Sequence, residues 1–88
     1  MNNVKKLRIK NVVTQIDVAE ALNTTKSNIS LMEKGRLSVR NAKLLAGYFG
    51  VSTTEVFGED IFKIFPETDE EKLYIINMLQ SRIAKNEN

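Results

Sequence analysis

The chain of 88 residues has no cysteine, no histidine and no tryptophan, and it has a single proline. Without cysteine there can be no disulfide framework, and without cysteine or histidine the usual ligands of zinc and haem iron are missing. The commonest general base and the best nucleophile are missing too. We therefore expect no enzyme, no metal and no cofactor, and a reducing compartment such as the cytoplasm.

Long hydrophobic runs are also lacking. No apolar stretch approaches the roughly 18 residues that span a bilayer. The chain also lacks the basic start and following apolar segment of a signal peptide. The contents of 42% hydrophobic and 27% charged residues are ordinary for a globular protein. The sequence thus predicts one small domain, or one domain with a tail, and no membrane partner.

The small net charge of +2 conceals a strong asymmetry. Residues 1–43 contain nine Lys or Arg against three acidic residues, whereas residues 44–88 contain four against eight. A basic half is typical of proteins that bind a polyanion, most often nucleic acid, although a solvated charged surface is an equally good explanation of charge alone.

Apolar spacing and cap residues predict a series of short helices and no strand of any length. Five residues are expected to cap helices at their N-termini: Thr14, Thr25, Ser38, Ser52 and Thr68. Three of them form the first half of a predicted capping box, with Asp17, Glu55 and Glu71 three residues later. The helices are then expected at about 4–10, 15–22, 26–33, 39–49, from 53, and 69–84.

The most informative segment is 15–32, where two helices of about eight residues flank a turn of about three. These are the proportions of a helix-turn-helix. Ala19 allows the second helix to come close, and Asn23 supplies the turn. The outer face of the second helix is mostly short and polar, which suits a major groove about 12 Å wide.

The residues around this segment sharpen the match. Arg8, Thr14-Gln15, Val18-Ala19, Asn23, Ile29-Ser30, Glu33 and Gly35 together resemble the motif of the Cro/C1-type (XRE-like) helix-turn-helix family. The resemblance covers about residues 4–58. It implies an all-α, compact five-helix lambda-repressor-like DNA-binding domain over residues 1–58, followed at 59–88 by a connector and an additional C-terminal helix.

The resemblance also implies roles for individual residues. Arg8 and Glu33 form an internal ion pair, the alternative being two surface charges. Base edges are read from the third helix by Thr25, Lys26, Ser27 and Leu31. DNA phosphates are bound by Gln15, Asn28, Ser30, Lys34 and Arg36. Lys26 suits guanine O6 and N7 but could equally hold a phosphate, and Leu31 could contact a thymine methyl or pack on a neighbouring loop.

The sequence departs from the family pattern at the ends of two helices. Val12 and Asn23 stand where the family often has glycine. Asparagine tolerates the left-handed conformation but valine does not, so we expect Asn11 to end the first helix and that end to be shaped differently. The stretch 36–40 also lacks a frequent proline.

The second half supplies candidates for a homodimer interface. One helix-turn-helix reads too few base pairs for useful specificity, and family members usually bind two-fold operators as dimers, with half-sites about one turn, roughly 34 Å, apart. The apolar candidates are Ile61, Phe62, Phe65, Leu73, Ile76, Leu79 and Ile83. The alternative is that this segment is a lid on the chain's own core.

Together these features predict a sequence-specific regulator of transcription, more specifically a repressor, that binds double-stranded DNA. No small-molecule substrate is evident. The alternative is a protein-interaction adaptor or antitoxin that uses the same fold.

Overall fold

The computed structural model describes the backbone of residues 1–64 and 66–86, and the side chains of residues 1–64 and 66–81. This part of the chain is all-helical and contains no strand, as predicted. The elements are α1 (Val4–Lys10), α2 (Gln15–Ala21), α3 (Lys26–Glu33), α4 (Val39–Phe49), α5 (Thr53–Phe57), the 3-10 helix η1 (Gly58–Lys63) and α6 (Asp69–Asn86). None of the helices in the described ranges has the length and apolar character needed to cross a membrane.

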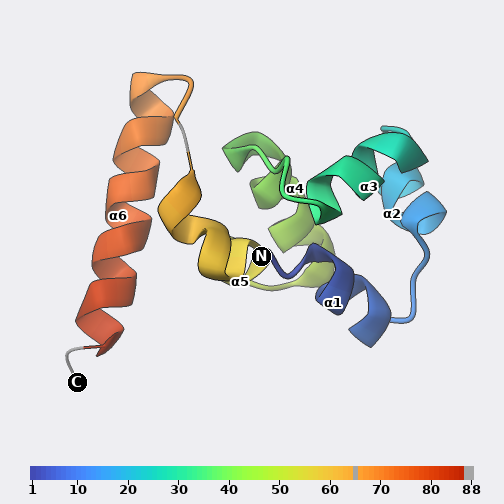
Figure 1. The fold of residues 1–88 in the computed structure, drawn as a ribbon, viewed down its shortest axis with the longest axis horizontal. Helices are drawn as coiled ribbons and strands as arrows, with labels where there is room; N and C mark the ends of the chain where they lie inside the picture. The colour runs from blue at the N-terminus through green and yellow to red at the C-terminus, as the bar shows by residue number, and fades with distance from the viewer. Residues whose placement is uncertain (65, 87–88) are drawn as a thin grey trace.

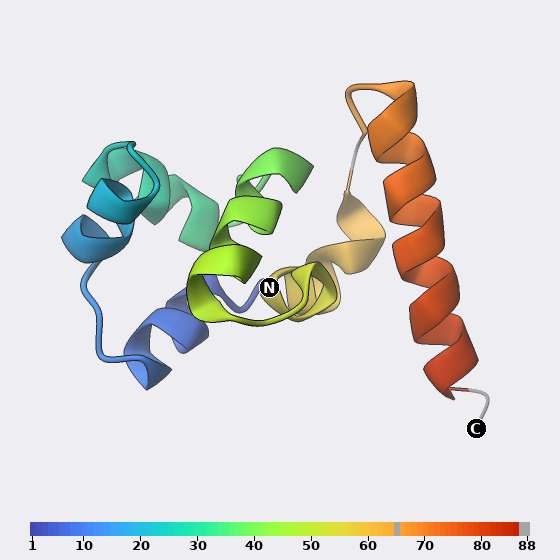
Figure 2. The same cartoon turned by 180° about the vertical axis from the view of Figure 1, so that it is seen from behind.

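Helices α1 to α5 gather into one bundle, and α6 lies along its side, beyond α5 and η1 (Figure 1). Helices α2 and α3 occupy the other end of the longest dimension, as the view from behind also shows (Figure 2). The core contains a fully buried side chain from almost every element, namely Val4, Val18, Ile29, Leu45, Phe57 and Ile61. The helix-turn-helix therefore shares its buried core with α1 and α4, and α6 is remote from it.

The N-terminal caps confirm the predicted helix starts. In each case a side-chain oxygen accepts a hydrogen bond from the backbone N–H three residues later, at Thr14, Thr25, Ser38, Ser52 and Thr68. At Thr14 the box is complete, because the Asp17 carboxylate accepts the Thr14 N–H at 2.8 Å. That backbone hydrogen bond lowers the pKa of Asp17. At Thr68 the box differs from the prediction, since Glu71 accepts the N–H of Glu67 instead.

The end of α1 contradicts the sequence prediction. Asn11 has an ordinary φ of −91°, and it is Val12 that takes the left-handed conformation, with a φ of 55°. The N–H of Val13 donates to the carbonyl of Arg8, and the N–H of Val12 to that of Ile9. This is the hydrogen-bond pattern of a Schellman motif, so the helix ends as a glycine-containing helix would, with a valine in the glycine position.

The next two helices end in the same way but with more suitable residues. Asn23 has a φ of 54° after α2, as predicted, and Gly35 has a φ of 117° after α3. The carbonyl groups of Ala19 and Leu31 accept the corresponding hydrogen bonds, from Thr24 and Arg36. Strain is therefore concentrated at Val12, because a branched Cβ is the least compatible with positive φ.

Replacing Val12 with glycine should therefore stabilise the protein. The valine side chain is 89% exposed, so its removal loses almost no buried surface. Relief of the left-handed strain should raise the free energy of unfolding by about 1 kcal/mol, even after the greater chain entropy of glycine is subtracted. Thermal unfolding followed by circular dichroism measures the gain. Val12→Ala keeps a Cβ and should recover less, and a glycine variant that melts below the wild type would contradict this interpretation.

Helix α6 is attached to the bundle by one of its faces. Ile75 and Met78 are 7% and 8% exposed and join the core. The hydroxyl of Tyr74 is 2.6 Å from Oγ1 of Thr53, and the ammonium group of Lys43 lies 4.1 Å from the centre of the Tyr74 ring. This face of α6 therefore acts as the lid that the sequence left as an alternative.

One of the predicted dimer residues needs correction, because Ile61 in η1 is only 1% exposed and its apolar surface stabilises the monomer's own fold. Leu79 is partly buried against the core, so its place in a dimer interface stays a prediction. Phe62, Leu73 and Ile76 remain exposed by 68%, 64% and 44%. Phe65 and the side chain of Ile83 lie outside the described residues.

Candidate nucleic-acid interface

The outer face of α3 is exposed at the end of the molecule opposite α6 (Figure 1). Thr25, Lys26 and Ser27, at its N-terminal end, are all exposed, and Leu31 one turn later is 39% exposed. The hydroxyl oxygen of Thr25 accepts the N–H of Asn28, which leaves its hydrogen able to donate outward. The four residues predicted to read bases thus lie on an accessible helix face.

The opposite face of α3 is firmly packed. Ile29 and Met32 are buried against Val18 and Ala19 of α2 within the core. The small Ala19 of α2 is 4% exposed, in keeping with the close approach of α3 that the spacing predicted. Because this apolar face is fixed, the polar face of α3 has one orientation relative to the rest of the bundle.

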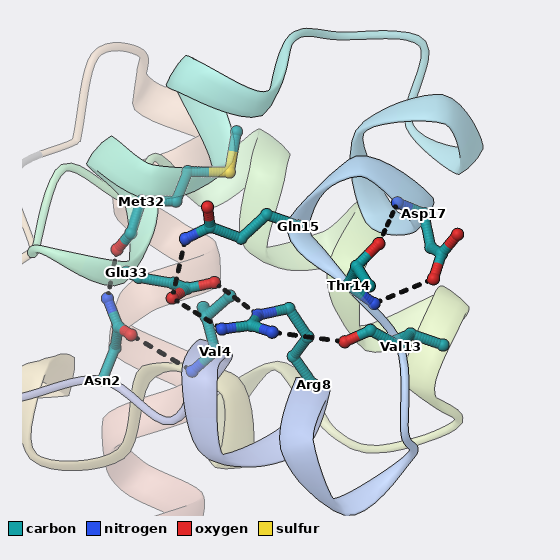
Figure 3. Close-up of polar contacts among 9 residues, drawn as sticks. All are labelled: Asn2, Val4, Arg8, Val13, Thr14, Gln15, Asp17, Met32 and Glu33. Carbon is teal, nitrogen blue, oxygen red and sulfur yellow. Dashed lines mark hydrogen bonds and ion pairs between the residues drawn. The ribbon is translucent and has the colours of Figure 1, made fainter.

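An ion pair joins α1 to the last residue of α3 (Figure 3). Nε of Arg8 lies 2.9 Å from Oε2 of Glu33, and a second guanidinium nitrogen lies 3.5 Å from Oε1. The two side chains are only 16% and 7% exposed, and Arg8 also donates to the carbonyl of Val13 at 3.3 Å. The predicted internal pair is therefore present in the structure, partly buried and bidentate, which is the stronger arrangement for arginine and carboxylate.

Gln15 belongs to the same cluster, which the sequence did not indicate. Its side-chain nitrogen donates to Oε1 of Glu33 at 3.2 Å, so α2 is tied to the ion pair as well (Figure 3). This bond is compatible with the predicted phosphate contact of Gln15, because the amide has two hydrogens and the bond to Glu33 uses only one of them.

Asn2 provides a further support that sequence reasoning missed. Its side-chain nitrogen donates to the carbonyl of Met32 at 2.6 Å, and its oxygen accepts the N–H of Val4 at 3.1 Å (Figure 3). The carbonyl of Met32 already accepts the N–H of Gly35, and this second hydrogen bond joins the end of α3 to the segment before α1. An asparagine before the first helix reads in sequence only as a cap, so no local signal indicates this bond.

The remaining phosphate candidates differ in their availability. Lys34 and Arg36 are exposed just after α3, and Ser30 is half-buried. The amide of Asn28 donates to Oγ1 of Thr24 at 2.8 Å and so stabilises the turn before α3. The long cations are free to reach a polyanion, and the exposed amide of Asn28 keeps a second N–H that is not used in this bond.

Helices α2 and α3 thus form a helix-turn-helix in which the outer face of α3 is exposed. The partly buried Arg8–Glu33 ion pair joins the end of α3 to α1. A model of the helix-turn-helix family matches residues 4–56, which is more than half of the chain and contains the whole of α1 to α3. The chain belongs to the Cro/C1-type (XRE-like) helix-turn-helix family. It is accordingly a DNA-binding transcription regulator with the lambda-repressor-like fold.

No curated protein and no solved structure matches this chain. Within the described residues, no group of three or more carboxylates could hold a metal ion.

Proposed function

We propose that this helix-turn-helix protein is a sequence-specific repressor that binds a two-fold operator in double-stranded DNA as a homodimer. Helix α3 enters the major groove, where Thr25, Lys26, Ser27 and Leu31 face the base edges. The observation that carries the proposal is that the N-terminal end of α3 is polar and exposed, while its C-terminal end is joined to α1 by the partly buried Arg8–Glu33 ion pair. A cytoplasmic location remains part of this proposal.

Repression is the simplest outcome of such binding. A protein that occupies DNA at a promoter excludes polymerase by its presence alone, so no further activity is needed. Lys26, Lys34 and Arg36 along and after α3 supply positive charge for the DNA backbone. The four base-facing side chains named above make the contacts whose strength depends on the DNA sequence.

The salt dependence of binding tests this function. Fluorescence anisotropy with a labelled duplex should give an affinity that falls by about 10³ between 50 and 200 mM salt, if a dimer contacts six or more phosphates. An adaptor or antitoxin that binds another protein through an apolar surface would show little response to salt. Absence of salt-sensitive binding to any duplex would contradict the proposed function.

The homodimer is supported by the free face of α6. Leu73 and Ile76 lie three residues apart on this helix and are 64% and 44% exposed, although a monomer gains nothing from exposing them. A second copy of the same face would bury both pairs, and a two-fold dimer is what a two-fold operator requires.

Placing a charge on this face should therefore yield a monomer. The double variant Leu73→Lys/Ile76→Lys should sediment as a single chain and keep the helical content of the wild type, because neither side chain lies in the core. Ser81→Lys adds one such charge at an exposed position of α6 that lies to the side of the Leu73 and Ile76 face, and it should remain dimeric. A double variant that sediments like the wild type would exclude this face as the dimer interface.

A further inference from the structure

Two consecutive asparagines, Asn2 and Asn3, connect helices that are distant in the sequence. They precede α1, in the stretch of chain that passes beside α5 (Figure 1). Both side chains are half-buried, and neither belongs to the helix-turn-helix. Asn2 bonds to the end of α3 and Asn3 to the end of α5. The two residues therefore join the base-reading helix to the part of the bundle that contacts α6.

The carboxamide of Asn2 is engaged at both of its ends. Nδ2 donates to the carbonyl of Met32 at 2.6 Å, and Oδ1 accepts the N–H of Val4 at 3.1 Å (Figure 3). Val4 is fully buried, so the group on one side of this amide is fixed by the core. A planar amide that is bonded through both its nitrogen and its oxygen has one orientation. The carbonyl of Met32 is therefore held at a defined place relative to the start of α1.

Asn3 attaches the same segment to α5. Its backbone N–H donates to the carbonyl of Val56 at 2.9 Å, and its Nδ2 donates to the carbonyl of Glu55 at 2.8 Å. The next element begins at Gly58, where φ is 56° and a Cβ would lie only 2.8 Å from Nδ2 of Asn3. Glycine thus leaves the room that the Asn3 side chain occupies, and the segment is closely fitted to the junction of α5 and η1.

The series of hydrogen bonds continues to the helix that carries the proposed dimer face. The hydroxyl of Tyr74 in α6 donates to Oγ1 of Thr53, the first residue of α5, at 2.6 Å. In a two-fold dimer formed through α6, the separation of the two base-reading helices depends on where each α3 lies relative to its own α6. The bonds of Asn2 and Asn3 lie on the path between these two helices.

A small movement at the end of α3 would matter at the bases. Lys26 lies six residues before Met32 in this helix, about 9 Å away along its axis. A tilt of about 10° at the Met32 end would therefore displace the backbone of Lys26 by about 1.5 Å. Binding groups have to be held within about 0.5 Å of their productive positions. A bond at the far end of α3 is thus able to influence which DNA geometry the helix fits.

We propose that Asn2 is a positioning residue, which holds the end of α3 at a fixed place relative to α5 and so sets the distance between the two base-reading helices of the dimer. The inference rests on the proposed function, because half-site spacing has a meaning only for a dimer that reads DNA. Asn2 itself contacts no base. It selects operators by the spacing of their half-sites.

The test measures binding of the full chain to fluorescein-labelled duplexes that carry the operator obtained by selection from random-sequence DNA. A matched series adds or removes one base pair between the half-sites, which changes their separation by about 3.4 Å and their relative rotation by about 35°. Fluorescence anisotropy gives the affinity for each duplex. Each variant is measured at a temperature at which its circular dichroism shows the helical content of the wild type.

Asn2→Asp is the decisive variant, because it keeps the acceptor for the N–H of Val4 and loses the donor to Met32. The preference for the selected spacing over the altered ones should fall about fivefold, which corresponds to about one hydrogen bond. The bases preferred within each half-site should not change, since Ile29 still packs α3 in the core. Asn2→Ala, which loses both bonds, should show the same relaxed spacing.

Asn11→Ala is the matched control. The amide of Asn11 donates to the carbonyl of Leu7 at 2.8 Å, which is the same kind of bond at the end of α1 instead of α3. Its loss should lower the melting temperature by an amount similar to that of the Asn2 variants. The preference for the selected spacing should stay that of the wild type.

The outcomes separate this inference from the proposed function. A wild type that binds no duplex, or that binds half-sites with no preferred spacing, would overturn both. A preferred spacing that Asn2→Asp and Asn2→Ala retain in full would overturn the inference alone. An equal loss of spacing preference in Asn11→Ala would do the same, because the effect would then come from stability and not from the position of α3.

Discussion

Arg8→Ala should lower the free energy of unfolding by about 3 kcal/mol, because it leaves the carboxylate of Glu33 covered and without its cation. Glu33 is 7% exposed and loses two guanidinium contacts in this variant, and the carbonyl of Val13 loses a third. For a domain of this size such a loss should reduce the melting temperature by more than about 10 °C. Thermal and urea unfolding, followed by circular dichroism, would measure both quantities.

A charge-matched control distinguishes the ion pair from a general effect of charge. Lys6→Ala removes an exposed cation from the same helix and should change stability by less than about 0.5 kcal/mol. Adding Glu33→Gln to Arg8→Ala should restore part of the loss, since the unpaired charge is then gone and the two positions are coupled. Equal melting temperatures for Arg8→Ala and Lys6→Ala would show that the pair does not support the fold.

Replacing both Lys26 and Ser27 with alanine should lower the affinity for the operator by about 10- to 100-fold, since direct base contacts contribute on the order of 1–3 kcal/mol each. Both side chains are exposed, so the folded structure should be retained. Discrimination between operator and unrelated DNA should fall as well, which a phosphate contact alone would not produce. Competition binding with specific and unrelated duplexes measures both effects.

Lys72→Ala is the control for the loss of charge. Lys72 is exposed on α6, at the other end of the molecule from α3 (Figure 2). Its replacement should leave discrimination unchanged. If the α3 double variant discriminates as well as Lys72→Ala does, base reading by the N-terminal end of α3 is refuted.

The helix starts could be predicted from the sequence because each depends on local chemistry. Thr14, Thr25 and Ser38 bond to a backbone N–H only three residues away, so their type and spacing are sufficient. The exposed face of α3 could be predicted for the same reason, from helical periodicity. These features determine where the helix-turn-helix lies and which side of it is free.

The end of α1 could not be predicted, because local preference was overruled by packing. Valine disfavours a positive φ, and Asn11 offered a more suitable residue one position earlier. With the turn at Val12, Val4 and Leu7 are buried, and Val13, which precedes the N-cap of α2, packs against the core. The apolar contacts of the neighbouring segments therefore compensate for a strained residue that is itself exposed.

Contacts between distant segments were also beyond sequence reasoning. Gln15 bonds to Glu33 and Asn2 to Met32 across 18 and 30 positions, and neither pair has a distinctive spacing. The division of α6 into a docked and a free face depended on where η1 brings the chain. That is why Ile61 and Leu79 could not be told apart from Leu73 and Ile76 by composition.

The most direct test of whether α3 reads DNA is to select duplexes from a random-sequence pool. The wild-type protein and the Lys26→Ala/Ser27→Ala variant would each be used for selection from the same pool. We expect the wild type to enrich a motif with two-fold symmetry, and the variant to lose base preference at the same positions in each half. A wild type that enriches no motif, or a variant that enriches the same motif with equal strength, would contradict the role of α3.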